Sequence, residues 1–247
     1  MGDKKRAEKL AAVIAALAVW QVFAMILGNS LLVAAPLDVA GRLFNLCISM
    51  EFWRIVGFSF VRIVYGFILA LAAGIVFAIL ASRFRIVETM LFPYMLAVKS
   101  TPVASFIVLC LIWLSSKSLS VFIAFLIVLP IVYTNALHGI RDTDQKLLEM
   151  ADLFRVRWWR KLYYIYIPQL KPYLLSACSV SIGMSWKAGI AAEVIGIPEG
   201  SIGEKLYEAK VYFSSVDLFA WTVAIIVLSI LSEKLFIYIL KSFLKPR

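Results

Sequence analysis

Long runs of apolar residues alternate with short charged clusters along the whole chain. A helix needs about 20 consecutive apolar residues to cross a bilayer, and it satisfies all of its own backbone groups in lipid. We therefore predict an all-α integral membrane protein with six transmembrane helices, in which residues 1–247 form one domain. The predicted spans are approximately residues 10–28, 58–82, 91–115, 119–139, 173–197 and 218–240.

Basic residues concentrate on one side of this predicted bundle. Six crossings place both chain ends on the same side, together with the turn at 82–88 and the loop 140–171. These segments carry far more Lys and Arg than the opposite side. Because cytoplasmic segments are enriched in Lys and Arg, both termini are predicted to be cytoplasmic. The first apolar run is followed by no small-residue cleavage site, so we interpret it as a span and not as a signal peptide.

The composition excludes most other protein classes. Apolar residues make up 63% of the 247 residues and charged residues 16%, which is unlike a water-soluble enzyme. The net charge of +10 does not indicate nucleic-acid binding, since no basic face alternates with exposed aromatic residues. Three scattered cysteines (Cys47, Cys110 and Cys178) and one histidine, His138, predict neither a disulfide framework nor a metal site.

The loop 140–171 is the longest segment predicted on the inner side. Asp142 or Thr143 could cap a first helix. A second helical stretch, 157–166, is rich in aromatic residues and is predicted to end at Pro168 and Pro172. The apolar positions that recur at helical spacing in the first helix are Leu147, Leu148, Ala151 and Phe154.

Two interpretations of this loop are compatible with each other. The aromatic and basic residues of 158–166 are typical of an interfacial helix at the lipid headgroups. In the same loop, Leu148, Ala151 and Phe154 could point outward and dock on a cytoplasmic partner.

A short motif in the loop resembles the EAA signature of binding-protein-dependent ABC importer permeases. Glu149-Met150-Ala151 is followed, nineteen residues after the Glu, by Pro168. Met150 replaces an Ala of the signature, and Arg155 stands where the signature has a Gly. Since Gly allows the chain to turn between two short helices, Arg155 puts the local turn in question but leaves the spacing intact.

The resemblance extends over most of the chain, to the nitrate/sulfonate/taurine-type permeases. It implies a MetI-like fold, a dimer of permease subunits, a cytoplasmic dimer of ABC ATPases, an external solute-binding protein and a place in the bacterial inner membrane. The segments that carry it are 35–38, 60–67, 99–102, 111–114 and 186–196.

The resemblance also assigns the coupling to the ATPase to a helix at approximately 145–157. Glu149 would be an anchor at the ATPase surface or, alternatively, would interact only with the helix dipole or an Arg. Ala151 would allow close approach, and Phe154 could fill an apolar pocket. The chain has no GxxxxGK[ST] loop, so ATP and Mg would be bound by the partner and no cofactor by this chain. The predicted coupling residues are Leu148, Glu149, Ala151, Asp152, Phe154, Arg155, Arg157 and Pro168.

Two charged residues lie inside the predicted fifth span, Lys187 and Glu193. A charge in mid-span costs about 2.5–3.5 kcal/mol on insertion scales, so each should face protein or water. Glu193 lies near the outer edge at the level of Arg62, which predicts an Arg62–Glu193 pair between two helices. Lys187 lies about 120° around the helix from Glu193. It could line the translocation path and attract an anion, or be neutralised by a carboxylate elsewhere.

Further residues of this span could line the path or pack against a helix. Trp186 could belong to either environment, and Ser181 and Ser185 form part of a small-residue stripe. We therefore predict a permease subunit for a small, anionic, organic solute, in contact with membrane lipid but not with nucleic acid, and forming a homodimer. The competing interpretations are an intramembrane lipid-modifying enzyme, which would need clustered His, Asp or Glu, and a channel or autonomous carrier.

Overall fold

The computed structural model describes residues 2–27 and 33–243, in which every regular element is helical, as the apolar pattern predicts. Residue 28, the predicted end of the first span, and the basic residues Lys245 and Arg247 lie outside the described residues. The α-helices are α1 Gly2–Leu27, α2 Pro36–Ile48, α3 Met50–Arg83, α4 Arg85–Ser100, α5 Val103–Cys110, α6 Ser116–Arg141, α7 Gln145–Leu153, α8 Trp158–Lys161, α9 Ile167–Gly196, α10 Ile202–Val211 and α11 Ser215–Phe243.

Four helical segments of the described chain are long and apolar enough to cross a membrane: α3, α6, the continuous segment Trp158–Gly196, and α11. The helices α4 and α5 satisfy the same condition only as a pair. In α1 the described apolar part is shorter, Ile14–Ile26. By length and composition, the described residues therefore contain four candidate spans, or five if the α4–α5 pair crosses as one.

The predicted third span, 91–115, is wrong in shape. Instead of one straight helix, α4 and α5 meet at an angle of 107°. The break lies at Thr101 and Pro102, where Thr101 is extended (φ −81°, ψ 130°). Proline disfavours the helical conformation in the residue before it, which explains why α4 ends there.

The predicted helix end at Pro168 and Pro172 is also wrong. The chain stays helical from Trp158 to Gly196, through a π-helical segment, Leu162–Tyr166, that joins α8 to α9. Pro168 is the second residue of α9, directly after the π-helical segment, and Pro172 lies inside the helix. A π-helical turn is a common way to accommodate an irregularity within a continuous helix.

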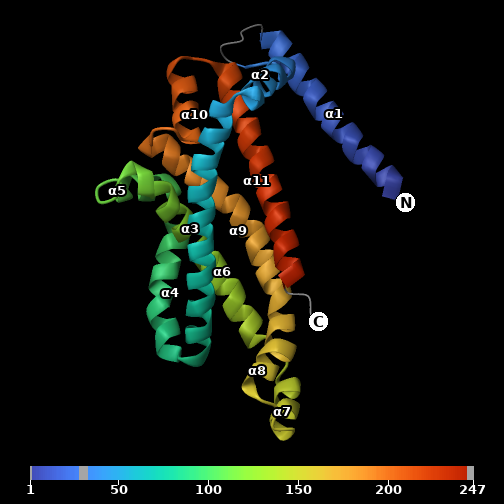
Figure 1. Cartoon of the computed structure of the whole chain (residues 1–247), viewed down its shortest axis with the longest axis vertical. Helices are drawn as coiled ribbons and strands as arrows, with labels where there is room; N and C mark the ends of the chain where they lie inside the picture. The colour runs from blue at the N-terminus through green and yellow to red at the C-terminus, as the bar shows by residue number, and fades with distance from the viewer. Residues whose placement is uncertain (1, 28–32, 244–247) are drawn as a thin grey trace.

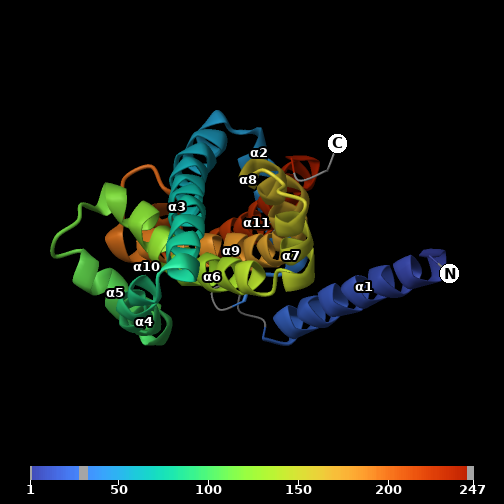
Figure 2. The same cartoon turned by 90° about the horizontal axis from the view of Figure 1, so that it is seen from below.

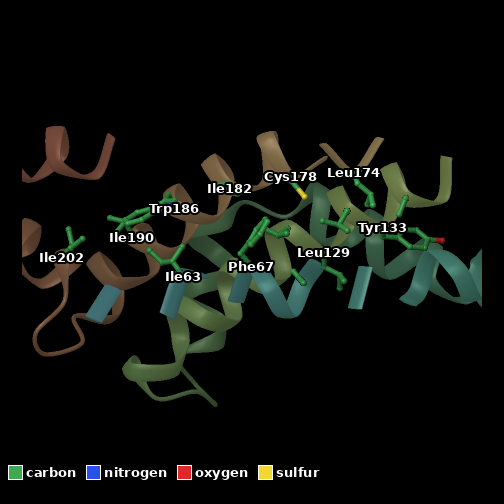
Figure 3. Packing of buried hydrophobic residues seen from close by; sticks show 14 of the residues in the cluster. Ile63, Phe67, Leu129, Tyr133, Leu174, Cys178, Ile182, Trp186, Ile190 and Ile202 are labelled. Atoms are coloured by element: carbon green, nitrogen blue, oxygen red, sulfur yellow. The ribbon is translucent and has the colours of Figure 1, made fainter. Parts of the chain in front are cut away.

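The helices α3, α6 and α9 form the centre of the molecule and run lengthwise beside one another (Figure 1). Their buried residues interlock, with Ile63 and Phe67 of α3, Leu129 of α6, and Ile182 and Trp186 of α9 in one cluster (Figure 3). The α3 and α6 backbones approach closely, because a Cβ at Gly66 would lie 2.4 Å from the carbonyl oxygen of Val121. This centre fixes the position of both ends of α9.

The two ends of the molecule carry different short helices (Figure 1). At one end α2 and α10 lie beside the start of α3 and of α11, and at the other end α7 and α8 project beyond the turn between α3 and α4. α1 diverges from the other helices in both views (Figures 1 and 2). One of its contacts is the ring of Trp20, whose centroid is 5.5 Å from that of Phe219.

Candidate functional site

The predicted coupling helix is present as α7, Gln145–Leu153. Its N-cap is Asp144, whose carboxylate accepts a hydrogen bond from Lys146 N (2.9 Å), and not the predicted Asp142 or Thr143. Thr143 instead belongs to the end of α6, since its hydroxyl donates to the Gly139 carbonyl (3.2 Å). A single Asp side chain thus begins α7 directly after the turn that follows α6.

Side chains from the α8–α9 segment hold α7 and its preceding turn in place. Gln169 Oε1 accepts from Asp144 N (2.8 Å), and the Tyr173 hydroxyl donates to the Asp142 carboxylate (2.7 Å). Lys161 forms an ion pair with Asp152. A movement of α7 should therefore be passed to the first turns of α9.

The faces of α7 are not oriented as predicted. Ala151 is buried and Leu148 is half-buried, so both pack against the protein instead of pointing outward. Phe154 does point outward, with 73% of its surface exposed, and Glu149 is exposed next to this face. The outward apolar side chains of this region are Leu147, Met150, Leu153 and Phe154.

Arg155 makes the turn that a Gly would make in the signature. Its φ is +51°, in the left-handed region, and the turn is closed by hydrogen bonds from Arg155 N to Asp152 O (2.9 Å) and from Val156 N to Ala151 O (2.8 Å). This is a Schellman helix end. The turn therefore forms without Gly, at a conformational cost of roughly 1–2 kcal/mol for a residue with a side chain.

Two other predicted coupling residues mark helix starts. Arg157 is the exposed N-cap residue of α8, and Pro168 is exposed in the first turn of α9. The structure thus distributes the eight predicted coupling residues over α7, the Arg155 turn, α8 and α9.

At the opposite end of α9, Glu193 lies in a buried polar cluster. Only 1% of its surface is exposed. Its Oε2 accepts a hydrogen bond from the Ser59 hydroxyl (2.7 Å) and a long one from Gly203 N (3.4 Å), and the Ser59 oxygen accepts from Ile202 N (2.9 Å). The carboxylate therefore faces the positive N-terminus of α10 and connects α3, α9 and α10.

The close approach of α10 to α9 requires Gly203. A Cβ at this position would lie 2.3 Å from the Cβ of Glu193 and 2.4 Å from its carbonyl carbon. Since a backbone atom cannot move aside as a side chain can, no larger residue fits while α10 keeps this position.

The predicted Arg62–Glu193 ion pair is not formed. Arg62 Nη2 donates to the carbonyl of Ser116 (3.1 Å), and its guanidinium lies 4.6 Å from the centroid of the Phe58 ring. Ser59, almost one turn earlier on α3, takes the position nearest the carboxylate. Arg62 thus connects α3 to the start of α6, and Glu193 connects α9 to α3 and α10.

The predicted path residues of α9 lie on different faces. Trp186, Ser181 and Ser185 are buried within the subunit, with exposed fractions of 1%, 0% and 2%. Lys187 is exposed, and no described residue forms an ion pair or hydrogen bond with its ammonium group. An unpaired ammonium group in mid-span is unfavourable in lipid, so this face of α9 requires water or a second protein surface.

The exposed face around Lys187 extends along α9 at helical spacing. Its exposed or partly exposed members are Pro172, Ser176, Val180, Met184, Lys187, Ala191 and Ile195. Lys187 is the one charged residue among these face residues, and the others are small or apolar.

A charged cavity of about 470 Å³ lies beside α10, at the same end as Glu193. Within α10, Lys205 forms an ion pair with Glu208 (2.9 Å), whose carboxylate raises the pKa of this Lys. The charged residues that line the cavity are Glu51, Arg54, Glu199, Glu204 and Lys205. This end therefore presents both signs of charge to solvent.

Several residues around Glu193, and several that hold α7 in place, were not predicted from the sequence. Ser59, Gln169 and Tyr173 are single polar residues without a motif, and their partners are far away in the chain. The start of α10 could have been predicted from the spacing of Ser201 and Glu204. In the structure, the Ser201 hydroxyl accepts from Glu204 N (3.0 Å), and the Glu204 carboxylate accepts from Gly200 N (2.6 Å). A Ser followed three residues later by a Glu predicts such a helix start.

The comparison with known proteins identifies the type of chain. Residues 66–247 match the family described as binding-protein-dependent transport system inner membrane component. The putative aliphatic sulfonates transport permease protein SsuC of Bacillus subtilis is 26% identical over 220 residues, which are 88% of this chain and 79% of that protein.

Two further relatives come from Synechococcus elongatus. The nitrate import permease protein NrtB is 23% identical over 204 residues, or 78% of this chain and 72% of the relative. The bicarbonate transport system permease protein CmpB is 25% identical over 159 residues, or 64% and 57% of the two chains.

Proposed function

Because the chain belongs to the family of binding-protein-dependent transport system inner membrane components, we propose that it forms the translocation path for a small anionic solute and couples this path to a separate ATPase. Membership of this family makes the chain an ABC transporter permease of the bacterial inner membrane and not an enzyme. The competing interpretation as a lipid-modifying enzyme is not needed to explain any feature of the molecule.

The observation that carries the solute class is the unpaired, exposed Lys187 on α9. An ammonium group in a water-filled path attracts anions electrostatically. Three relatives are named for sulfonate, nitrate and bicarbonate, which are all small anions. Trp186, Ser181 and Ser185 would support the path from behind, because their side chains are buried in the subunit.

The exposed face of α9 supports a homodimer as the functional state. A lipid-facing Lys187 would be costly, whereas two copies of this face around one aqueous path would hydrate both ammonium groups. For the remaining parts of the assembly we propose two cytoplasmic ATPase subunits, which would bind ATP and Mg, and an external solute-binding protein. The charged cavity beside α10 is the surface that we assign to the solute-binding protein.

The arrangement in the membrane is part of the same proposal. Six crossings, with α4 and α5 together forming the third and α1 the first, would leave both termini cytoplasmic, in agreement with the Lys and Arg distribution. α7 would then project into the cytoplasm, towards the ATPase.

We assign the predicted coupling residues to separate tasks. Glu149, Phe154 and Arg155 would contact the ATPase, because their side chains are exposed. Leu148 and Ala151 would seat α7 on the subunit, and Asp152 would connect it to Lys161. Arg157 and Pro168 begin α8 and α9.

The first experiment is a mild detergent purification of the tagged chain from its own bacterium, followed by mass spectrometry. An ATPase subunit in approximately equal amount supports the proposal, and its absence contradicts it. The solute class is then tested by uptake of an alkanesulfonate, nitrate and bicarbonate into vesicles that contain the assembled transporter.

Lys187→Ala should lower anion uptake about tenfold or more, because the electrostatic attraction of the anion is lost, and leave co-purification of the ATPase intact. Lys117→Ala is the matched control, since Lys117 is also exposed but lies on α6. Unchanged uptake by Lys187→Ala would remove Lys187 from the path.

A further inference from the structure

The start of the α8–α9 segment exposes aromatic and basic side chains together. Trp158, Trp159 and Tyr164 have exposed fractions of 58%, 76% and 65%, and the neighbouring Arg157 and Arg160 are also exposed. We call these five residues the α8 patch. Its composition differs from the outward face of α7, which is apolar with an exposed Glu149.

The two arginines of the α8 patch are free to bind a ligand. Neither guanidinium forms an ion pair or hydrogen bond with a described residue, whereas the adjacent Lys161 is occupied by Asp152. A guanidinium presents a planar set of donors that matches the oxygens of a phosphate group.

The position of the patch indicates which phosphate it meets. α8 continues directly into the membrane-spanning part of α9 and lies just beyond the turn between α3 and α4, where Arg83 ends one helix and Arg85 begins the next (Figure 1). Trp and Tyr side chains are enriched at this boundary between hydrocarbon and water. With the proposed orientation, the patch lies in the headgroup region of the cytoplasmic leaflet.

We propose that the α8 patch binds the headgroup phosphate of an anionic phospholipid and thereby fixes the height of α7 at the membrane surface. Arg157 and Arg160 contact the phosphate, and Trp158, Trp159 and Tyr164 insert at the level of the headgroups. Because Lys161 joins α8 to Asp152 of α7, the bound lipid also orients the ATPase-contacting helix. The location of the patch rests on the proposed topology and function.

The test uses the assembled transporter in lipid nanodiscs, with phosphatidylcholine alone or mixed with phosphatidylglycerol. One readout is the amount of phosphatidylglycerol retained per complex after purification from the mixture, measured by mass spectrometry. The other is solute-stimulated ATP hydrolysis as the phosphatidylglycerol fraction rises. The variant is Arg157→Gln with Arg160→Gln, and the matched control is Arg83→Gln with Arg85→Gln, which removes the same charge near the same level.

We expect the α8 double variant to bind phosphatidylglycerol about 30-fold more weakly, from about 1 kcal/mol per basic residue at an anionic surface. Its hydrolysis should lose the response to phosphatidylglycerol, and the control should keep both lipid retention and response. Equal effects of the two double variants would overturn the proposal, because phosphatidylglycerol binding would then depend only on the total positive charge at this level and not on the α8 patch.

Two other outcomes are informative. If the α8 variant loses the ATPase subunit or its hydrolysis equally in phosphatidylcholine alone, the arginines contact the ATPase and the lipid proposal is wrong. If the unmodified complex shows no solute-stimulated hydrolysis in any lipid, the proposed transport function fails, whereas lipid retention still decides the role of the patch.

Discussion

The two ends of α9 are built in opposite ways. At the Glu193 end, buried polar groups of α3, α9 and α10 are joined by hydrogen bonds through Glu193 Oε2 and the Ser59 hydroxyl, with little exposed surface. At the Tyr173 end, α7 and α8 are largely exposed, and the contacts that hold them include hydrogen bonds of Gln169 and Tyr173 and the Lys161–Asp152 ion pair. The first end is suited to keeping α10 fixed, and the second is suited to meeting a partner and passing its movement to α9.

This difference has energetic consequences that mutations can measure. A change in the buried cluster leaves polar groups unpaired or forces helices apart, so it should cost stability. A change at the α7 end alters exposed contacts, so it should cost little stability and act mainly on coupling.

The largest loss of stability is expected for Gly203→Ala. The new Cβ would collide with the backbone of Glu193 and displace α10, at a cost of about 3 kcal/mol or more. The measurement is the thermal unfolding of the purified protein in detergent. Gly41→Ala in α2 is the matched control, since nothing lies within 4 Å of its added Cβ, and it should unfold at the same or a higher temperature. Equal unfolding temperatures for both variants would contradict the close contact.

A smaller loss, of about 2 kcal/mol, is expected for Glu193→Ala. The change leaves the Ser59 hydroxyl and Gly203 N without their acceptor in a buried site. Glu193→Gln should lose less, because its amide oxygen can still accept. Glu199→Ala, an exposed position beyond the end of α9, serves as the control. If Arg62→Gln and Glu193→Gln destabilised the protein strongly and non-additively, the purified protein would contain the Arg62–Glu193 ion pair, which contradicts the structure.

A gain in stability of about 1 kcal/mol is expected for Arg155→Gly. Gly adopts the observed φ of +51° without the steric cost that a side chain carries. Arg155→Ala is the matched control, because it removes the same guanidinium and keeps the Cβ, and it should give no gain. Protection of the α7 amides from hydrogen exchange measures the difference locally. Equal protection in the two variants would show that the φ of this residue carries no strain.

The smallest effect on stability, below about 1 kcal/mol, is expected for Gln169→Ala. It removes the acceptor of Asp144 N at a partly exposed site. The coupling should suffer more than the stability, so that less solute moves for each ATP hydrolysed by the reconstituted transporter. Lys146→Ala, on the exposed side of α7, is the control and should keep the ratio. An unchanged ratio in Gln169→Ala would mean that this hydrogen bond does not pass movement to α9.

The sequence by itself determined the features that depend on a short, continuous stretch of residues: apolar spans, helical spacing and the motif around Glu149. The long apolar runs predicted helical spans at α3, α6, α9 and α11, because hydropathy over about 20 residues decides whether a segment prefers lipid. The helical spacing of Leu147, Leu148, Ala151 and Phe154 predicted α7, and the motif around Glu149 pointed to the permease family. These signals are local, so packing is not needed to detect them.

Only the tertiary structure decided which side chains meet. The lipid-facing and protein-facing sides of a spanning helix are both apolar, so helical periodicity could not show that Trp186 is buried and Lys187 exposed. The partner of Glu193 is Ser59 and not Arg62, because the packing of α3 on α9 determines the distance between residues more than 130 positions apart. Likewise, Ala151 points inward because side chains of α9 hold α7 in that orientation. The spacing of residues along one helix fixes the angles between their side chains around the helix axis. Which of these side chains faces the protein depends on helices that are distant in sequence.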